Sequence, residues 1–192
     1  MTESSSGVAV VFIDLQEGFF EFPEMQDSRQ RLVSESTWLA GVARSHGHRV
    51  FVVRTVHARD KSTWTLKMLE DDQGFNFEGS HQAELLNELE LEPATHLQKI
   101  RDSAFHGTSL AQRLRTGGIH TLVLAGVTAE SCVGATGRDA FAHDFQVVYA
   151  RNAIASSDPD SGWSELEGIC ENFRQRILDR PDLERLLTTT SG

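Results

Sequence analysis

Short apolar runs that alternate with helical patterns constrain the fold of this chain more than any other feature. Four runs, rich in Val, Leu, Ile and Phe, span 8–13, 49–54, 121–125 and 145–149, and another run spans 94–98. This last run, the third in chain order, is weaker than the others and follows Pro93. Short apolar runs without polar alternation are typical of strands that are covered on both faces, as in a parallel sheet. The sequence therefore predicts at least five such strands.

Helical patterns separate these runs. Apolar residues recur every three or four positions over 29–45, 82–90, 109–116 and 129–143. Gly47, Gly117 and Gly118 follow predicted helix ends, where glycine permits the left-handed cap, and Pro93 is expected to end another helix. Parallel neighbours need crossover connections, so the alternation predicts an α/β fold with helices on both faces of a parallel sheet. Active sites of such sheets lie beyond the carboxyl ends of the strands.

Length and charge limit the classes of function. A chain of 192 residues is expected to form a single domain over 1–192. Its formal net charge is -10 and it has no cluster of Lys and Arg, so nucleic acid is not an expected partner. We expect no membrane partner and a cytoplasmic location, because no apolar run has the length of a membrane span and no secretory signal is recognisable. The two cysteines are too few for a disulfide framework.

Two other segments lack a clean pattern or carry unusual charge. The segment 55–79 has no regular period and is expected to be a long functional loop or a small subdomain. The stretch 70–92 is acidic without Lys or Arg, which indicates a solvated face more than a cation site. The tail is expected to be helical over 163–179, followed by Pro181 and a frayed end at 188–192.

Reactive side chains follow three of the predicted strands. Asp14 comes directly after the first strand and Lys99 directly after the third. Cys132 follows the fourth strand and opens a helix, where backbone amides and the helix dipole favour a thiolate. Each residue has a simpler interpretation: Asp14 as a helix cap, Lys99 as a surface charge and Cys132 as a small core residue. Together they match the nucleophile, base and charge-fixing group of nucleophilic catalysis.

The surrounding motifs resemble the isochorismatase-like cysteine hydrolase family, which includes nicotinamidases, carbamoylsarcosine amidohydrolases and ureidoacrylate hydrolases. They are Phe-Ile-Asp-Leu-Gln around Asp14, Lys-Ile-Arg-Asp-Ser-Ala-Phe-His-Gly-Thr from Lys99, and Gly-Val-Thr-Ala-Glu-Ser-Cys-Val around Cys132. The resemblance implies a catalytic triad of Asp14, Lys99 and Cys132. It also implies a Rossmann-like, three-layer α/β/α fold with a six-stranded parallel sheet, one strand more than the five found here.

The same resemblance implies further features of the site. A cis peptide between Val127 and Thr128 would turn the Thr128 amide toward the substrate, and this amide and that of Cys132 would form an oxyanion hole. The reaction would be hydrolysis of a C–N bond in a small amide, ureido, carbamoyl or lactam substrate through a thioester on Cys132. Relatives form dimers or tetramers, so a homo-oligomer is expected.

Two other functions stay open. Isochorismatase proper cleaves a vinyl ether and is associated in the family with a site that lacks the cysteine, so Cys132 favours C–N hydrolysis. A non-catalytic α/β protein that binds a small molecule is the other alternative, but the sequence has no glycine-rich phosphate loop. Asn152 stands where many relatives have Asp, with no consequence that the sequence reveals.

Substrate contacts are predicted from residues near the same strand ends. Gln16, Phe19 and Phe20 are candidates for one wall of the pocket, and Trp64 and Phe105 for others, although core packing explains these aromatic residues equally well. His57 and His106 are polar candidates whose alternative is a structural histidine. Cys170 is expected in the core.

No metal and no cofactor are predicted. Nicotinamidases of the family carry a metal site after the second strand that begins with Asp-x-His and continues with a second His. The corresponding stretch here reads Arg-Thr-Val-His-Ala-Arg-Asp-Lys from Arg54, and it lacks both that Asp and the second His. Three protein ligands cannot be assembled there.

Overall fold

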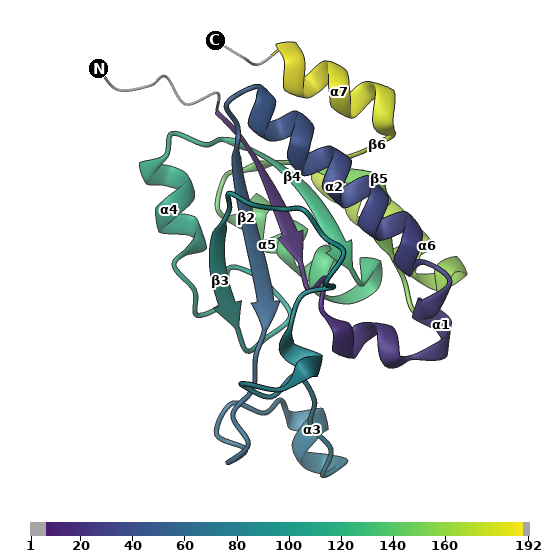
Figure 1. The fold of residues 1–192 in the computed structure, drawn as a ribbon. Helices are drawn as coiled ribbons and strands as arrows, with labels where there is room; N and C mark the ends of the chain where they lie inside the picture. Colours follow the sequence, from purple (N-terminus) through teal and green to yellow (C-terminus); the bar gives the residue numbers. More distant parts are fainter. Residues whose placement is uncertain (1–6, 190–192) are drawn as a thin grey trace.

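The computed structural model describes residues 7–189 and places six strands in one parallel sheet (Figure 1). The strands are β1 (Val8–Ile13), β2 (Arg49–Thr55), β3 (Thr95–Lys99), β4 (Thr121–Val127), β5 (Gln146–Ala155) and β6 (Arg176–Leu178). Their order across the sheet is β3-β2-β1-β4-β5-β6, and every neighbouring pair is parallel. The predicted α/β fold with a six-stranded parallel sheet is confirmed.

Helices cover both faces of the sheet, which explains why its central strands are apolar throughout. Alternate residues of β1 enter two separate cores: Val8, Val10 and Phe12 face one, while Ala9, Val11 and Ile13 face the other. The first core lies under α2 (Arg29–Ser45) and α7 (Arg180–Thr189). The second lies under α4 (Leu110–Thr116), α5 (Gly134–Ala142) and α6 (Pro159–Phe173). These three layers correspond to the α/β/α arrangement predicted from the sequence.

The chain changes direction across the sheet beside β1. It passes from β1 to β2 and β3 on one side, and then crosses back to β4, β5 and β6 on the other. Where the connections from two neighbouring parallel strands run to opposite sides of the sheet, a crevice opens at the carboxyl ends of those two strands. The residues that follow β1 and β4 therefore border this crevice.

One predicted helix is wrong. Residues 82–90 form no α-helix, and only the short 3-10 turn η2 (His81–Ala83) overlaps their start. Leu85 instead makes an antiparallel bridge with Gln16, and the Leu86 amide donates to the carbonyl of Leu15 at 3.0 Å. Glu84 and Glu88 would repel each other at helical spacing. Tertiary pairing with the chain after β1 therefore overrides the local helical pattern, and Pro93 ends no helix.

The sixth strand lies inside a segment that the sequence pattern assigns to a helix. The predicted helix 163–179 extends too far, because α6 ends at Phe173 and Arg174 takes a left-handed conformation with φ 53°. β6 follows and pairs with β5 through Ile177 and Tyr149. A strand of three residues has too little pattern to be recognised from sequence. Pro181 lies in the first turn of α7, which reaches Thr189; residues 190–192 of the predicted frayed end lie outside the described part of the chain.

The irregular segment 55–79 forms a small projection beyond the carboxyl ends of β1 and β2, with α3 (Leu66–Glu70) at its tip (Figure 1). His57 and Phe77 pair at its base, and Trp64 packs on Phe77 with ring centroids 5.9 Å apart. The remaining short elements are η1 (Glu17–Glu21), α1 (Pro23–Gln26) and η3 (Ala129–Val133). No helix within residues 7–189 has the length and apolar character that a membrane span requires.

Candidate active site

Four side chains from four adjacent strand ends meet at the carboxyl edge of the sheet. Asp14 follows β1, Thr55 ends β2 and Lys99 ends β3. Cys132 lies in η3, which follows β4. All four residues are buried. Because β3, β2, β1 and β4 are consecutive in the sheet, these four polar side chains converge on one point.

Asp14 and Lys99 form an ion pair inside the protein. Lys99 Nζ lies 2.7 Å from Asp14 Oδ2, and neither side chain is exposed. Asp14 Oδ1 accepts hydrogen bonds from the Thr55 amide at 2.8 Å and from the Thr55 hydroxyl at 3.0 Å. Apart from the ion pair, Oδ2 has no hydrogen-bond partner among the described residues. One carboxylate oxygen is thus held by Thr55, and the other retains the capacity to accept a proton.

The ammonium group of Lys99 connects this carboxylate to the thiol. Its Nζ donates to Thr55 Oγ1 at 2.7 Å and to the Arg101 carbonyl at 3.1 Å. It also lies 3.2 Å from Cys132 Sγ. A single positive charge is therefore placed beside both groups that can become negative during a reaction.

Electrostatics favours a protonated thiol in the resting protein. Burial raises the pKa of Cys132, and the negative charge of Asp14 raises it further, while Lys99 acts in the opposite direction. Burial by itself would lower the pKa of Lys99, but Asp14 and then Cys132 raise it above its usual value. The sequence analysis expects the first turn of a helix at Cys132 to stabilise a thiolate. The desolvation of the sulfur outweighs that effect.

Cys132 is held by a turn that other segments fix in place. The Thr128 carbonyl accepts hydrogen bonds from the amides of Ser131 and Val133, and the peptide bond between Val127 and Thr128 is cis. The chain from Ala129 to Val133 is a π-helical turn that continues directly into α5.

Thr136 links this turn to the chain after β3. Its hydroxyl donates to the Cys132 carbonyl at 2.6 Å and accepts from the Ala104 amide at 3.0 Å. Because Ala104 lies only a few residues beyond Lys99, the same hydroxyl fixes the thiol relative to the ammonium group. These hydrogen bonds position the nucleophile candidate with little freedom.

A cavity of about 370 Å³ opens next to Cys132. Apolar atoms form the larger part of its surface and polar side chains lie between them, a combination that suits a small-molecule site. The lining residues are Phe19, Phe22, Thr55, His57, Thr65, Lys67, Met68, Asp71, Gln73, Gly74, Phe75, Ile100, Arg101, Asp102, Ser131 and Cys132. Phe19 and His57, which the sequence analysis expects near the substrate, line this cavity together with Cys132.

Gln16 and Phe20 do not line this cavity, although both were expected at it. Gln16 is fully buried, and its Nε2 donates to the carbonyls of Thr55 and Ala83 at 2.9 and 3.0 Å. Its Oε1 accepts from the Thr55 amide at 2.8 Å. Phe20 packs in the core below α2, under the guanidinium of Arg29. Gln16 thus positions Thr55, and Phe20 stabilises the fold.

Trp64 and Phe105, which were also expected at the substrate, do not line this cavity. Trp64 lies within the projecting segment, where its Nε1 donates to the Ala58 carbonyl at 2.9 Å. Phe105 belongs to the second core and stacks on Phe145, with ring centroids 5.9 Å apart. Both rings are needed for packing, which a single sequence cannot distinguish from ligand contact.

His106 is exposed and does not belong to the cavity lining. Cys170 is partly buried and packs against the second core from α6. Asn152 lies in β5, and its carbonyl accepts a hydrogen bond from Arg31 of α2. These three residues are separate from the cluster around Cys132.

Several lining residues were missed by the sequence analysis. Thr55 carries the same signal as Asp14, a polar residue at the end of an apolar strand, and it could have been found in that way. Arg101 lies two residues after Lys99 and belongs to the same motif. Phe22 and Phe75 gave no signal, because they come from irregular segments whose paths depend on tertiary contacts.

His57 is held on the cavity wall by a contact with Thr63. Its Nδ1 lies 3.1 Å from the Thr63 carbonyl, which can only accept, so Nδ1 carries the proton. Burial lowers the pKa of His57, and the nearby charges of Arg101 and Lys99 lower it as well. Among residues 7–189 no three His, Cys, Asp or Glu side chains gather into a group that could hold a metal ion. His57 is therefore a neutral imidazole on the cavity wall.

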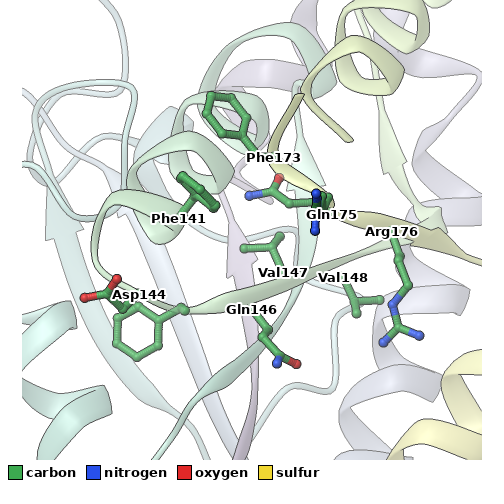
Figure 2. A pocket seen from close by; sticks show the side chains of 10 residues that line it. Phe141, Asp144, Gln146, Val147, Val148, Phe173, Gln175 and Arg176 are labelled. Atoms are coloured by element: carbon green, nitrogen blue, oxygen red, sulfur yellow. The ribbon is translucent and has the colours of Figure 1, made fainter. Parts of the chain in front are cut away.

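A second and larger hollow, of about 540 Å³, lies elsewhere in the molecule (Figure 2). It borders the amino ends of β5 and β6 and the C-terminal ends of α5 and α6. Figure 2 shows Phe141 and Phe173 side by side at its upper edge, with Gln175 and Arg176 beyond them. None of the residues predicted to act in catalysis lines it, so the cavity beside Cys132 is the candidate active site.

Comparison with known proteins identifies the family. Residues 8–171 match the family model described as the Isochorismatase domain. This chain belongs to the isochorismatase family. A crystal structure of an isochorismatase family protein from Desulfovibrio vulgaris subsp. vulgaris str. Hildenborough superimposes with a TM-score of 0.83 at 28% identity, over 94% of this chain and 98% of that one. The resemblance found in the sequence is thereby confirmed.

Curated isochorismatase relatives differ in what is known of them. An uncharacterized isochorismatase family protein, YecD of Escherichia coli O157:H7, is 30% identical over 79% of this chain and 81% of its own length. Maleamate amidohydrolase of Pseudomonas putida is 31% identical, over 50% of this chain and 45% of its own length. A probable inactive nicotinamidase of Arabidopsis thaliana is 28% identical over 83% of this chain and 86% of its own length. Members of the family are hydrolases, and several are amidohydrolases that act on C–N bonds.

Proposed function

We propose that this protein is a cysteine-dependent hydrolase that cleaves the C–N bond of a small amide, ureido, carbamoyl or lactam substrate through a thioester. The observation that carries the proposal is the position of Lys99 Nζ, 2.7 Å from the Asp14 carboxylate and 3.2 Å from Cys132 Sγ, at the wall of a cavity. The cluster contains a nucleophile, a base and a cation within direct contact, which is what covalent catalysis requires.

Asp14 acts as the base in this mechanism. The resting thiol is protonated, and Asp14 Oδ2 has no other hydrogen-bond partner among the described residues. As Sγ attacks the carbonyl carbon, its proton passes to Asp14, and a C–S bond forms while the carbonyl π electrons move to oxygen. Lys99 then compensates the negative charge that develops beside it, so no free thiolate has to persist in the buried site.

The amides of Thr128 and Cys132 are proposed to bind the oxygen of the tetrahedral intermediate. Thr128 directly precedes the turn η3 and Cys132 lies within it, and preorganised donors of this kind each lower the barrier by about 3 kcal/mol. Asp14 returns its proton to the leaving nitrogen, the C–N bond breaks, and ammonia or an amine departs. Asp14 then takes a proton from water, the resulting hydroxide opens the thioester, and the carboxylic acid and the thiol are released.

The test is a screen for ammonia or amine release over small amides, ureido acids, carbamoyl compounds and lactams. Cys132→Ala is the blank, and Cys170→Ala is the matched control because its sulfur lies outside the cavity. We expect turnover by the wild type and by Cys170→Ala, with none by Cys132→Ala. A thioester trapped on Cys132 and seen by mass spectrometry would support the mechanism directly. Full turnover by Cys132→Ala would reject it.

A further inference from the structure

Glu130 lies in the same turn as Cys132 and connects that turn to the chain after β5. Its Oε1 accepts hydrogen bonds from the Ser157 hydroxyl at 2.6 Å and from the Ser157 amide at 3.1 Å. Ser157 belongs to the connection between β5 and α6. The turn η3 is therefore bound to a segment that contains none of the proposed catalytic residues.

The second carboxylate oxygen of Glu130 packs against the first turn of α6. Oε2 is buried, and a Cβ atom at Gly162 would lie only 2.6 Å from it. Glycine at this position therefore leaves the space that the carboxylate occupies. The amino end of a helix carries a partial positive charge, which favours a carboxylate there. Glu130 is thus held by hydrogen bonds on one oxygen and by close packing on the other.

These contacts hold Glu130 in its charged form. Burial would raise the pKa of the carboxyl group, but the hydrogen bonds that it accepts, first of all from the Ser157 hydroxyl, keep the pKa below its usual value. Hydrogen bonds to a charged acceptor are roughly twice as strong as those between neutral groups. The Glu130 clamp, which consists of Glu130, Ser157 and Gly162, is therefore a firm link between η3 and α6.

Glu130 is the central residue of the segment on which the proposed reaction depends. The amides of Thr128 and Cys132, proposed above to bind the oxygen of the intermediate, lie two residues before it and two residues after it. From another side, the Thr136 hydroxyl connects the Cys132 carbonyl to the Ala104 amide. The turn is thus held from two directions, and Glu130 supplies the link to α6.

We propose that Glu130 is a positioning residue for Cys132, whose clamp keeps Sγ and the two amides of the turn in place relative to Asp14 and Lys99. Glu130 acts through the turn, because it is not among the residues that line the cavity. Without the clamp the reacting groups are aligned less often, which slows the chemical step more than it weakens substrate binding. The effect on turnover rests on the proposed hydrolase function, whereas the effect on the Cys132 thiol does not.

The first experiment measures kcat and KM with an amide that the screen identifies. We expect Glu130→Ala to lower kcat by about tenfold to a hundredfold with KM changed less than about twofold, because small misplacements cost rate more than affinity. Glu130→Gln should retain most of kcat, since its side-chain oxygen can still accept from Ser157. The matched control Glu165→Ala removes an exposed carboxylate from α6 and should leave both constants unchanged.

Three results of this experiment would overturn the proposal. They are a wild-type kcat in Glu130→Ala, a loss confined to KM, and a Glu130→Gln variant as slow as Glu130→Ala.

A second variant displaces the same carboxylate from the side of the helix. The nearest atoms to a methyl group in Gly162→Ala belong to the side chains of Ser156 and Glu130, so the strain falls on these side chains. Alanine is also a better helix former than glycine. We therefore expect Gly162→Ala to fold and to lower kcat. Gly168→Ala, with open space around it in the same helix, is the matched control and should keep the wild-type kcat. Equal kcat values for the two alanine variants would contradict the role of the carboxylate.

A third experiment needs no substrate. The readout is the rate at which iodoacetamide alkylates Cys132, followed by peptide mass spectrometry, with Cys170 of α6 in the same sample as the internal reference. Asp14 has to stay aligned to take the thiol proton, so we expect Glu130→Ala to slow alkylation of Cys132 by about tenfold. Cys170 should react as in the wild type, and Glu130→Gln should behave as the wild type at both thiols.

The outcomes of this third experiment separate the two proposals. Faster alkylation of Cys132 in Glu130→Ala, or an equal change at Cys170, would indicate a loosened fold and overturn the positioning role. If the expected slowing occurs while the wild type hydrolyses no amide in the screen, the proposed function fails and the positioning role stands. If the wild type hydrolyses amides and Glu130→Ala matches it in kcat and in alkylation, only the positioning role fails.

Discussion

Lys99 reaches across β2 to place its Nζ 2.7 Å from Oδ2 of Asp14, although the two residues end strands that are not neighbours in the sheet. Thr55 lies at the end of β2, between these two strands. Its hydroxyl accepts a hydrogen bond from Lys99 and donates one to Asp14. The ion pair of Asp14 and Lys99 is therefore held together by a third strand end, that of Thr55. Each charge of the pair is balanced by the other.

Removing the cation is expected to destabilise the protein strongly. Lys99→Met leaves the unexposed Asp14 carboxylate without its counter-charge, which costs about 3–5 kcal/mol of unfolding free energy. The double variant Asp14→Asn/Lys99→Met should be less destabilised than the sum of the single variants, because neither charge is left alone. Urea unfolding of the four proteins measures the coupling, and simple additivity would show that the pair does not interact.

The hydroxyl of Thr55 is expected to matter more than its methyl group. Thr55→Val removes one hydrogen bond from each member of the ion pair and should lower kcat/KM for amide hydrolysis by about tenfold to a hundredfold. Thr55→Ser keeps the hydroxyl and should retain most of the activity. Equal rates for the Val and Ser variants would show that the hydroxyl does not position Asp14 and Lys99.

Gly126 is expected to tolerate no side chain. Its φ is +124°, and a methyl group there would lie 1.9 Å from the carbonyl oxygen of Ile13 in the neighbouring strand. Gly126→Ala should therefore reduce the unfolding free energy by at least about 3 kcal/mol or prevent folding. Gly41→Ala is the matched control, because it lies in α2 with open space around it and should stabilise the helix by about 1 kcal/mol. Relative to the wild type, the melting temperature should fall for Gly126→Ala and rise for Gly41→Ala.

Stability is expected to fall as the pH drops below about 6.5, the ordinary pKa of histidine. His48 and His57 are buried, and burial lowers the pKa of each. In the window between their lowered folded pKa values and 6.5, the unfolded chain binds more protons, so acid favours unfolding. Urea midpoints at pH 7.5, 6.5 and 5.5 measure this slope.

His48→Gln should make that slope shallower, since glutamine can still donate to the Leu187 carbonyl but does not titrate. His106→Gln, at an exposed position, is the control and should leave the slope as it is in the wild type. A wild-type midpoint that does not change between pH 7.5 and 5.5 would contradict the buried neutral state of these histidines.

The sequence predicted the parts of the site that depend on local pattern. Asp14 and Cys132 follow strands that are buried throughout, Lys99 ends the weaker strand β3, and parallel strands bring their carboxyl ends to one edge. The motif around Cys132 also pointed to the family that the comparison shows. Neither inference required knowledge of the path of a loop.

The walls of the cavity could not be predicted in the same way. Of six predicted contacts, Phe19 and His57 line it, while Gln16, Phe20, Trp64 and Phe105 pack elsewhere. An aromatic residue beside a strand end has the same local pattern whether it faces a ligand or the core. Its direction is set by contacts that lie far away in the sequence.

Strand and helix periodicity, together with polar residues at the ends of apolar runs, determined by themselves that this chain folds as a layered α/β protein with reactive groups at one edge. Tertiary structure alone decided that 82–90 pairs with the chain after β1 and that 176–178 completes the sheet. It also decided that burial keeps the Cys132 thiol protonated beside Asp14 and Lys99. The physical reason is that periodicity acts within a few residues, whereas desolvation and long-range pairing depend on which distant segments exclude water from the site.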